Sequence, residues 1–481
     1  MNNAKLPACK TKVVCTIGPA SESPEMLEKM IDAGLSIARL NFSHGEFEKH
    51  AETINTIRNA SKKVGKRVAV MADLPGPKIR IGLLEKEPVE LKIGSRFTIT
   101  SEKITGNHEK ASVSLKELPE AVSPGNMIFL NDGLIQLRVE EVDGPDIHTV
   151  VSVGGKLRSR KGLNLPGIGL GISAFTQRDR ECMQFALEHG VDAISQSFVT
   201  TGQDIRDVRA AAEEMGYSPF IIAKIERASI HEHLDGILEA TDGVMVARGD
   251  LGVEIPIEEI AVAQKKITAR ANYFGKPVIT ATQMLESMTS NRRPTRAEAT
   301  DVANAILDGT DAVMLSEESA MGKYPLEACR MLVQIAQATE PHREELRAAP
   351  GPQPQAFQLA KRQVDFVATS VKSIISQDTA VAAILSPTES GLTARRLSRY
   401  KLPVWIFGVS SNKRTCQELM FSYGVFPLYE QHHPVDWTDY ARDYALQFGL
   451  EGNHIIQTEG PSPENPDRNH KIEIIDLRQI R

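Results

Sequence analysis

The feature that most constrains the fold is a series of short apolar segments that each end at a polar or charged residue. Eight of them alternate with helical segments. Short continuous apolar runs are typical of strands buried on both faces of a parallel sheet. Polar residues follow every strand, whereas an open doubly wound sheet would concentrate them at one switch point. We therefore predict an α/β fold with a closed barrel of eight strand–helix units.

Local signals mark where helices of these units begin and end. Ser23 and Gly34 have the spacing of an N-terminal cap and a C-terminal terminator, which predicts a helix between them. Ser43 is expected to cap the following helix. In the loop RRPTRAE, Thr295 and Glu298 have the spacing of a capping box, and we favour that interpretation over an anion site.

Two stretches interrupt or follow the strand–helix alternation. The first consists of short β-rich segments separated by turns, which predicts a small β-domain inserted into the barrel. Later, RAAPGPQPQ has the composition of a linker, and a further α/β unit follows it. We therefore expect barrel segments at 1–77 and 162–345, an inserted β-domain at 78–161 and a C-terminal α/β domain at 346–481.

Composition excludes several classes of protein. The chain has 481 residues, too many for one ordinary domain. Its net charge of −6 gives no general affinity for nucleic acid or anionic membranes. No run approaches the roughly 18 apolar residues of a membrane span. The five cysteines are scattered and form no CxxC motif, so we expect free thiols in a reducing cytoplasm.

Charged residues at two of the strand ends indicate phosphate and metal chemistry. Lys224 and Glu226 are two residues apart, so they point the same way on a strand. Asp250 follows another apolar run, and Gly249 beside it would let backbone amides approach an anion. Two carboxylates could share one hard cation there, with cationic groups close by.

We expect these strand ends to form one site, because the carboxyl ends of barrel strands converge on one mouth. Each residue also has a local alternative as a surface ion pair, a cap or an ordinary strand residue. One shared site accounts for all of them together. The convergent set is Arg39, Asn41, Ser43, Asp73, Ser197, Lys224, Glu226, Asp250, Thr282 and Glu318.

The series of motifs resembles the pyruvate kinase family. The matching segments are ARLNFSHG, AKIE, MVARGDLGVEIP, ATQMLESM, RPTRAE and DAVMLSEESA followed by GKYPLEA. A series in this order is far more specific than one short motif. The resemblance implies a TIM barrel, an inserted β-barrel lid, a C-terminal regulatory domain and a homotetramer. It also implies phosphoryl transfer from phosphoenolpyruvate to ADP, giving pyruvate and ATP.

The resemblance also implies roles at the barrel mouth. Glu226 and Asp250 would hold Mg²⁺ or Mn²⁺, and Lys224 would stabilise the transferring phosphoryl group. The proton donor would be Thr282 or a water chain that reaches Ser316 and Glu318. Substrate contacts would come from Arg39, Lys224, Thr282 and the amides of Gly249 and Asp250. Nucleotide contacts would come from Asn41, His44, Arg80 and Lys161, and His44 has an equally good structural interpretation.

One turn departs from the potassium-requiring members of this family. They bind potassium through side chains matching Asn41, Ser43 and Asp73, and carry glutamate where this chain has Lys78. An ammonium on that turn would supply the charge that potassium otherwise provides. We therefore expect an enzyme that works without potassium. The alternative is that Lys78 only pairs with a neighbouring carboxylate.

The segment SPTESGLTARR resembles the family's effector-phosphate loop. Its anion-binding positions would be Thr388, Ser390, Gly391 and Thr393, although a well-capped helix would look the same. Glu389 stands where bisphosphate-responsive members often carry lysine, so a sugar monophosphate, AMP or no effector stay open. No role is assigned to Thr200 or Glu317, which also depart from the family pattern. Two other functions stay open: a metal-dependent pyruvate aldolase or lyase on a similar barrel, and a non-catalytic metabolite sensor.

Overall fold

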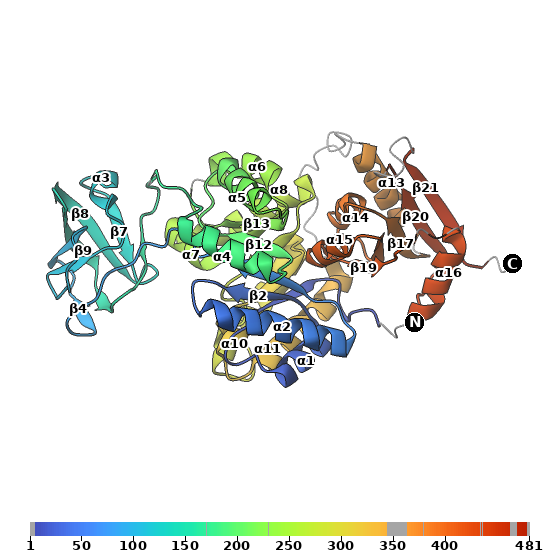
Figure 1. Ribbon diagram of the computed structural model, residues 1–481, viewed down its shortest axis with the longest axis horizontal. Coiled ribbons are helices and arrows are strands. Elements are labelled where there is room, and N and C mark those ends of the chain that lie inside the picture. Colours follow the sequence, from blue (N-terminus) through green and yellow to red (C-terminus); the bar gives the residue numbers. More distant parts are fainter. Residues whose placement is uncertain are drawn as a thin grey trace.

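The computed structural model describes residues 5–169, 171–228, 230–343, 363–378, 380–432, 434, 436–461 and 469–478. The predicted linker RAAPGPQPQ lies outside these residues. Three parts follow one another along the longest axis of the molecule (Figure 1): a β-rich insertion, a central barrel and a C-terminal α/β unit.

The predicted closed barrel is confirmed. Its strands are all parallel and close in the order β1-β16-β15-β14-β13-β12-β3-β2. They are β1 (Lys12–Thr16), β2 (Leu35–Asn41), β3 (Ala69–Asp73), β12 (Ala193–Gln196), β13 (Phe220–Ile225), β14 (Gly243–Ala247), β15 (Val278–Ala281) and β16 (Ala312–Leu315).

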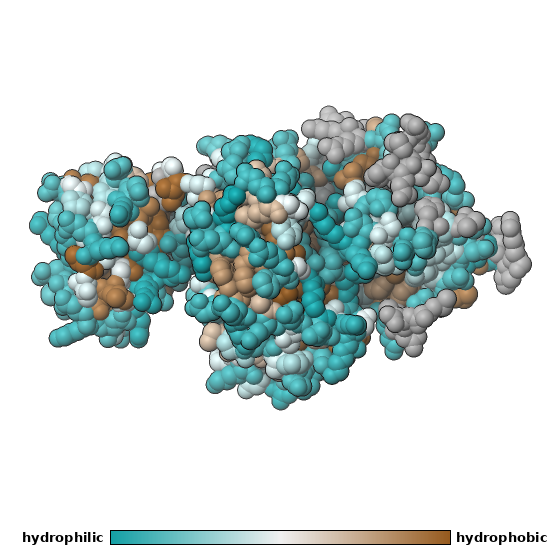
Figure 2. Space-filling model, in the orientation of Figure 1, coloured by the Kyte–Doolittle hydropathy of each residue, from teal (hydrophilic) through white to brown (hydrophobic). Residues whose placement is uncertain are grey.

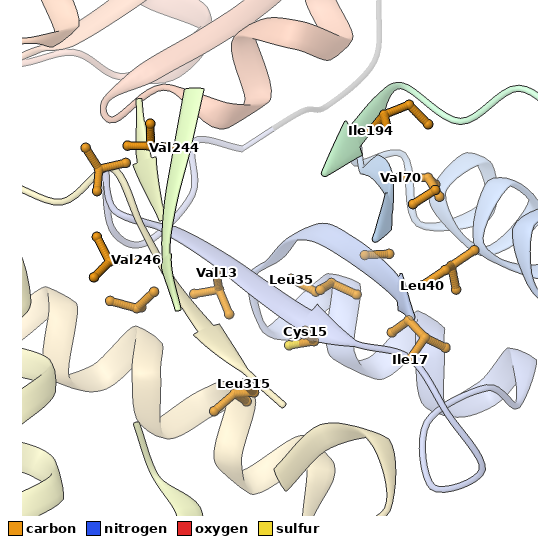
Figure 3. Close-up of a cluster of buried hydrophobic side chains, with 14 of the residues drawn as sticks. Val13, Cys15, Ile17, Leu35, Leu40, Val70, Ile194, Val244, Val246 and Leu315 are labelled. Carbon is orange, nitrogen blue, oxygen red and sulfur yellow. The ribbon is translucent and has the colours of Figure 1, made fainter. Parts of the chain in front are cut away.

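Side chains along each strand alternate between two cores, as the period of two requires. Val13 and Val246 belong to the larger core between strands and surrounding helices, part of which is drawn in Figure 3. Val14 and Met245 belong to the barrel interior. Both cores exclude water, which explains why the strands are continuous apolar runs.

Helices cover the outside of the barrel, and three predicted helix ends are confirmed. Ser23 accepts a hydrogen bond from Met26 N–H, and Gly34 terminates the same helix. Thr295 and Glu298 form the expected capping box. The main helices are α1 (Pro24–Ala33), α2 (Phe47–Val64), α4 (Gln177–Glu188), α5 (Gly202–Glu214), α6 (Ile230–Ala240), α8 (Ile260–Phe274), α9 (Arg296–Asp308) and α11 (Pro325–Thr339).

The prediction that Ser43 caps the second helix is wrong. Helix α2 begins at Phe47, and Glu46 precedes it without a capping side chain. Ser43 lies in a turn instead, where its backbone N–H donates to Asn41 Oδ1 at 3.1 Å. An asparagine that bonds the backbone two residues ahead closes such a turn, so the chain reverses before the helix starts.

The inserted unit is an antiparallel-rich β-domain with its own apolar core. It contains a six-stranded sheet in the order β11-β7-β8-β9-β5-β6 and a two-stranded sheet of β10 and β4. Its elements are β4 (Val89–Leu91), β5 (Arg96–Thr100), β6 (Lys110–Ser112), α3 (Leu118–Ala121), β7 (Met127–Leu130), β8 (Ile135–Asp143), β9 (Asp146–Val153), β10 (Gly155–Leu157) and β11 (Leu163–Asn164).

The C-terminal unit is an α/β sheet that closes the base of the barrel. Met420 and Phe421 from this unit pack into the barrel interior, where Phe421 stacks on Phe220 with ring centroids 5.1 Å apart. A buried ion pair of 2.6 Å joins Lys401 to Asp311 at the start of β16. The sheet has the order β19-β18-β17-β20-β21. Its elements are α13 (Gln363–Gln377), β17 (Val381–Pro387), α14 (Leu392–Ser398), β18 (Trp405–Ser410), α15 (Lys413–Glu418), β19 (Val425–Tyr429), α16 (Trp437–Phe448), β20 (His454–Glu459) and β21 (Lys471–Asp476).

The surface is mostly hydrophilic, as expected for a fold that buries its apolar residues in cores. On the face drawn in Figure 2, hydrophilic residues cover most of all three parts, with smaller apolar areas between them. Among the described helices, none combines the length and apolar character needed to cross a membrane.

Candidate active site

Strand ends from different parts of the chain meet at one end of the barrel. Arg39 lies near the end of β2, Asp73 ends β3, and Lys224 lies near the end of β13. The strand register sets Asn41 opposite Asp73, and Ser195 of β12 opposite Asp73 from the other side. Residues far apart in sequence therefore become neighbours because the barrel is closed.

Asp73 is the centre of a buried charge cluster. Its carboxylate accepts hydrogen bonds from Arg39 Nε at 2.8 Å and from Ser195 Oγ at 2.9 Å, and Lys224 Nζ lies 3.4 Å away. Burial acts to raise the pKa of Asp73, but the charges of Lys224 and Arg39 outweigh it and hold that pKa below its ordinary value. Asp73 is therefore an anion that holds both cations in place.

Lys224 bridges Asp73 and Glu226. Its Nζ lies 2.8 Å from Glu226 Oε1 and donates to Ser197 Oγ at 2.7 Å. Burial opposes the charge of Lys224, but Asp73 and Glu226 outweigh it and raise the pKa of this ammonium. The predicted Lys224–Glu226 pair is thus a contact within a buried network, not an exposed ion pair.

Glu226 and Asp250 fit a site for a hard divalent cation. Burial raises the pKa of Glu226, Lys224 opposes this, and the negative charge of Asp250 raises that pKa further, which indicates that the two carboxylates act on each other. Within the described residues, no group of three or more His, Cys, Asp or Glu side chains is placed to bind one metal ion together. Mg²⁺ suits such a donor set, because it binds through one or two carboxylates and completes its shell with water and phosphate oxygens.

Thr282 faces the start of a short helix, α7 (Arg248–Glu254), that follows β14. Its Oγ accepts a hydrogen bond from Gly249 N–H at 2.7 Å and donates to Ala281 C=O at 2.7 Å. Thr282 and Gln283 both have positive φ, at 65° and 52°. Positive φ is rare for a β-branched residue, so the turn that presents this hydroxyl is strained.

Ser316 and Glu318 lie after the end of β16, but the Glu318 carboxylate is already occupied. It accepts backbone N–H groups from Leu285 at 3.0 Å and from Ser316 at 2.7 Å. Burial raises the pKa of Glu318. The geometry gives Glu318 a role in holding two loops together at the barrel mouth.

Two of the candidate nucleotide residues, Arg80 and Lys161, lie where the chain passes between the barrel and the inserted β-domain. Arg80 and Gly162 pair as a β-bridge, so the two connections between the inserted β-domain and the barrel run beside each other, with Lys161 on one of them. Burial lowers the pKa of His44, and the charges of Arg80, Lys78 and Arg39 lower it further. The positive charges of Arg80, Lys78 and Arg39 are therefore near enough to act on the imidazole of His44.

The candidate effector loop lines a cavity of about 900 Å³ in the C-terminal unit. Thr388 Oγ accepts Gly391 N–H at 3.0 Å, and Gly391 precedes α14. Among the described residues, Arg414 is the only arginine or lysine that lines this cavity. The four carboxylates that line it belong to Glu389, Glu418, Glu430 and Glu459.

Two residues of the site were missed from the sequence. Ser195 donates to Asp73, and Thr16 Oγ accepts Arg39 Nη1 at 2.8 Å. The signal for Ser195 was present, because it precedes Ser197 by two residues and a strand points both the same way. Thr16 ends β1, but a single threonine at a strand end carries too little information to single out.

Comparisons with known proteins show the family that this chain resembles in sequence and in fold. The family model "Pyruvate kinase, barrel domain" matches residues 8–329, and "Pyruvate kinase, alpha/beta domain" matches residues 366–474. A pyruvate kinase of Thermococcus litoralis is 49% identical over 88% of this chain and 89% of its own length. One from Thermotoga maritima is 42% identical over 94% and 96%. The crystal structure of a pyruvate kinase from Cryptosporidium parvum superposes with a TM-score of 0.86 at 35% identity, covering 98% of this chain and 96% of that one.

Proposed function

Because the chain belongs to the pyruvate kinase family and is therefore a phosphotransferase, we propose that its barrel mouth transfers the phosphoryl group of phosphoenolpyruvate to ADP without a potassium ion. The observation that carries the proposal is the buried cluster of Arg39, Asp73, Lys224 and Glu226. Charges that are fixed before the substrate arrives stabilise a transferring phosphoryl group without reorganising.

In this proposal the cluster handles the phosphoryl group and α7 handles the rest of the substrate. Lys224 and Arg39 contact the phosphate, while Thr282 and the amides of Gly249 and Asp250 hold the carboxylate. The nucleotide phosphates face Asn41, His44, Arg80 and Lys161. Glu226 and Asp250 would hold Mg²⁺ or Mn²⁺, which neutralises charge on the phosphoryl oxygens when bound.

Thr282 is the favoured proton donor to the enolpyruvate carbon. Its hydroxyl lies beside the helix start that would hold the substrate carboxylate. Glu318 is less suited, because both of its oxygens accept backbone hydrogen bonds. A water chain through Ser316 is the remaining alternative. Because Thr282 also contacts the substrate carboxylate in this proposal, kcat and KM separate the two. Thr282→Val should abolish kcat if the hydroxyl itself donates, and should mainly raise KM for phosphoenolpyruvate if a water chain does.

Lys78 supports the potassium-independent reaction. Lys78 is an exposed residue, and it forms no ion pair with any other described residue, which disfavours the alternative that it only pairs with a carboxylate. Its charge reaches His44 together with that of Arg39. Lys78 would therefore supply positive charge at the turn where Asn41, Ser43 and Asp73 would otherwise bind a monovalent cation.

The other parts of the molecule have proposed roles as well. The inserted β-domain would close over the mouth and exclude water, which would otherwise accept the phosphoryl group. The acidic lining of the C-terminal cavity disfavours a bisphosphate, so a sugar monophosphate or AMP at Thr388, Ser390, Gly391 and Thr393 is the proposed effector. We propose a cytoplasmic homotetramer, and the five buried free cysteines suit a reducing compartment.

The test is ATP formation from phosphoenolpyruvate and ADP. Turnover is monitored by coupling the pyruvate that forms to the oxidation of NADH. We expect turnover in a magnesium buffer whose monovalent cation is tetramethylammonium, a rate within about twofold of that in potassium, and loss of turnover with a chelator. Absence of ATP would refute the phosphotransfer. Activity that requires potassium would refute only the role of Lys78.

A further inference from the structure

Arg248, at the start of α7, uses its whole guanidinium inside the protein. The side chain is 10% exposed. A guanidinium has five N–H donors, and the guanidinium of Arg248 donates five hydrogen bonds. Nε donates to Ala281 C=O at 3.2 Å; Nη1 donates to Asp301 at 2.7 Å and Gln264 at 3.3 Å; Nη2 donates to Thr282 C=O at 2.7 Å and Met284 Sδ at 2.8 Å. Every donor is used, so none is left for a substrate.

The acceptors of Arg248 surround the strained turn at the end of β15. Two of them are the carbonyls of Ala281 and Thr282, and a third is the sulfur of Met284. Thr282 and Gln283, within this turn, are the residues with positive φ. A non-glycine residue keeps such a conformation only where its surroundings force it. The guanidinium contacts this turn through three acceptors, and Asp301 on α9 accepts a further hydrogen bond from it.

The turn decides where the Thr282 hydroxyl points. With φ at 65°, Thr282 Oγ meets Gly249 N–H, one residue after Arg248. An added Cβ on Gly249 would lie at an ordinary contact distance of 3.6 Å from that oxygen, so the direct link between the two elements is the hydrogen bond of 2.7 Å. Arg248 therefore donates to the carbonyls of the turn, while the next residue of its own helix, Gly249, donates to the Thr282 hydroxyl.

We propose that Arg248 is a positioning residue, which with Asp301 clamps the turn at Thr282 and Gln283 so that the Thr282 hydroxyl faces the substrate side of α7. This inference rests on the proposed function of Thr282. It assigns Arg248 no contact with substrate. The clamp supports the binding of phosphoenolpyruvate and the proton transfer. It does not affect the binding of ADP.

The test compares Arg248→Lys with a matched control. Lysine has three donors and no planar fork, so it cannot hold all these acceptors. We expect kcat/KM for phosphoenolpyruvate to fall about 10- to 100-fold, the result of losing one or two charged hydrogen bonds, with KM for ADP within about twofold. Arg58→Lys is the control. Arg58 also bonds backbone carbonyls and an aspartate, but at the base of the barrel, so only thermal stability should fall.

A rescue variant separates positioning from a general structural role. The Gln283 side chain is exposed, and glycine adopts positive φ without strain. Gln283→Gly should be nearly neutral alone and should restore kcat/KM of Arg248→Lys about fivefold or more. If Arg248→Lys does not fold, Asp301→Asn carries the same test, with an expected loss of about 3- to 10-fold and the same rescue.

Three results would overturn the inference. The first is a loss of kcat/KM for phosphoenolpyruvate in Arg248→Lys or Asp301→Asn that is no greater than in Arg58→Lys. The second is a rise in KM for ADP as large as that loss, and the third is a Gln283→Gly substitution that restores no kcat/KM. A wild-type protein that forms no ATP refutes the proposed function itself. The two failures are therefore distinguishable.

Discussion

Replacing Lys224 with methionine tests the charge cluster most directly. The Lys224 ammonium lies 2.8 Å from Glu226 and 3.4 Å from Asp73, and its side chain is 12% exposed. Two unit charges about 4 Å apart interact by about 4 kcal/mol at an effective dielectric constant near 20. If Lys224 faces a phosphoryl oxygen at such a distance, its loss lowers kcat about 10³-fold.

The same substitution predicts a pH-dependent loss of stability. Removing one partner of a buried pair costs about 3–5 kcal/mol, because Glu226 is left with less compensation. Burial already raises the pKa of Glu226, and Lys224 opposes this rise. Without Lys224 the folded state holds a proton on Glu226 more readily than the unfolded state. A folded state that binds more protons loses stability as pH rises. The deficit of Lys224→Met should therefore be smaller at pH 5 than at pH 8.

The measurements are steady-state kcat by the coupled assay and chemical denaturation at both pH values. Lys66→Met is the matched control, because Lys66 forms an exposed pair with Asp32. It should change kcat by less than twofold and stability by less than about 1 kcal/mol. A Lys224→Met enzyme with kcat within tenfold of the wild type would refute the proposed role of this ammonium. A deficit that grows towards pH 5 would refute the assignment to Glu226.

Three further changes test other parts of the molecule. Lys78→Glu should lower activity about tenfold in tetramethylammonium and recover in potassium; equal rates in both salts would contradict the role of Lys78. Phe421→Ala should destabilise the protein by about 3–5 kcal/mol in urea unfolding, because it empties the space against Phe220 at the base of the barrel, and a loss below 1 kcal/mol would contradict this packing. Thr295→Ala should cost about 1 kcal/mol in the same assay through loss of the capping box, whereas an unchanged midpoint would show that this cap does not limit stability.

Predictions from the sequence succeeded where the signal lies within a few residues. The alternation of Val13 and Val14 between two cores, and the cap at Ser23, follow from period and spacing alone. The contact of Lys224 with Glu226 follows from the same period of two. Ser43 shows the limit of local signals, because the Asn41 side chain closes a turn there and the helix starts four residues later.

Tertiary structure decided what depends on closure of the chain. Asp73 joins Arg39, Ser195 and Lys224, which lie on three other strands, and only the closed barrel brings them within contact distance. The sequence alone determined the strand–helix order, the strand ends that carry charge and the family resemblance. It could not show the partners of Arg248, because their positions depend on how three elements pack, and packing is set by surfaces buried between residues distant in sequence.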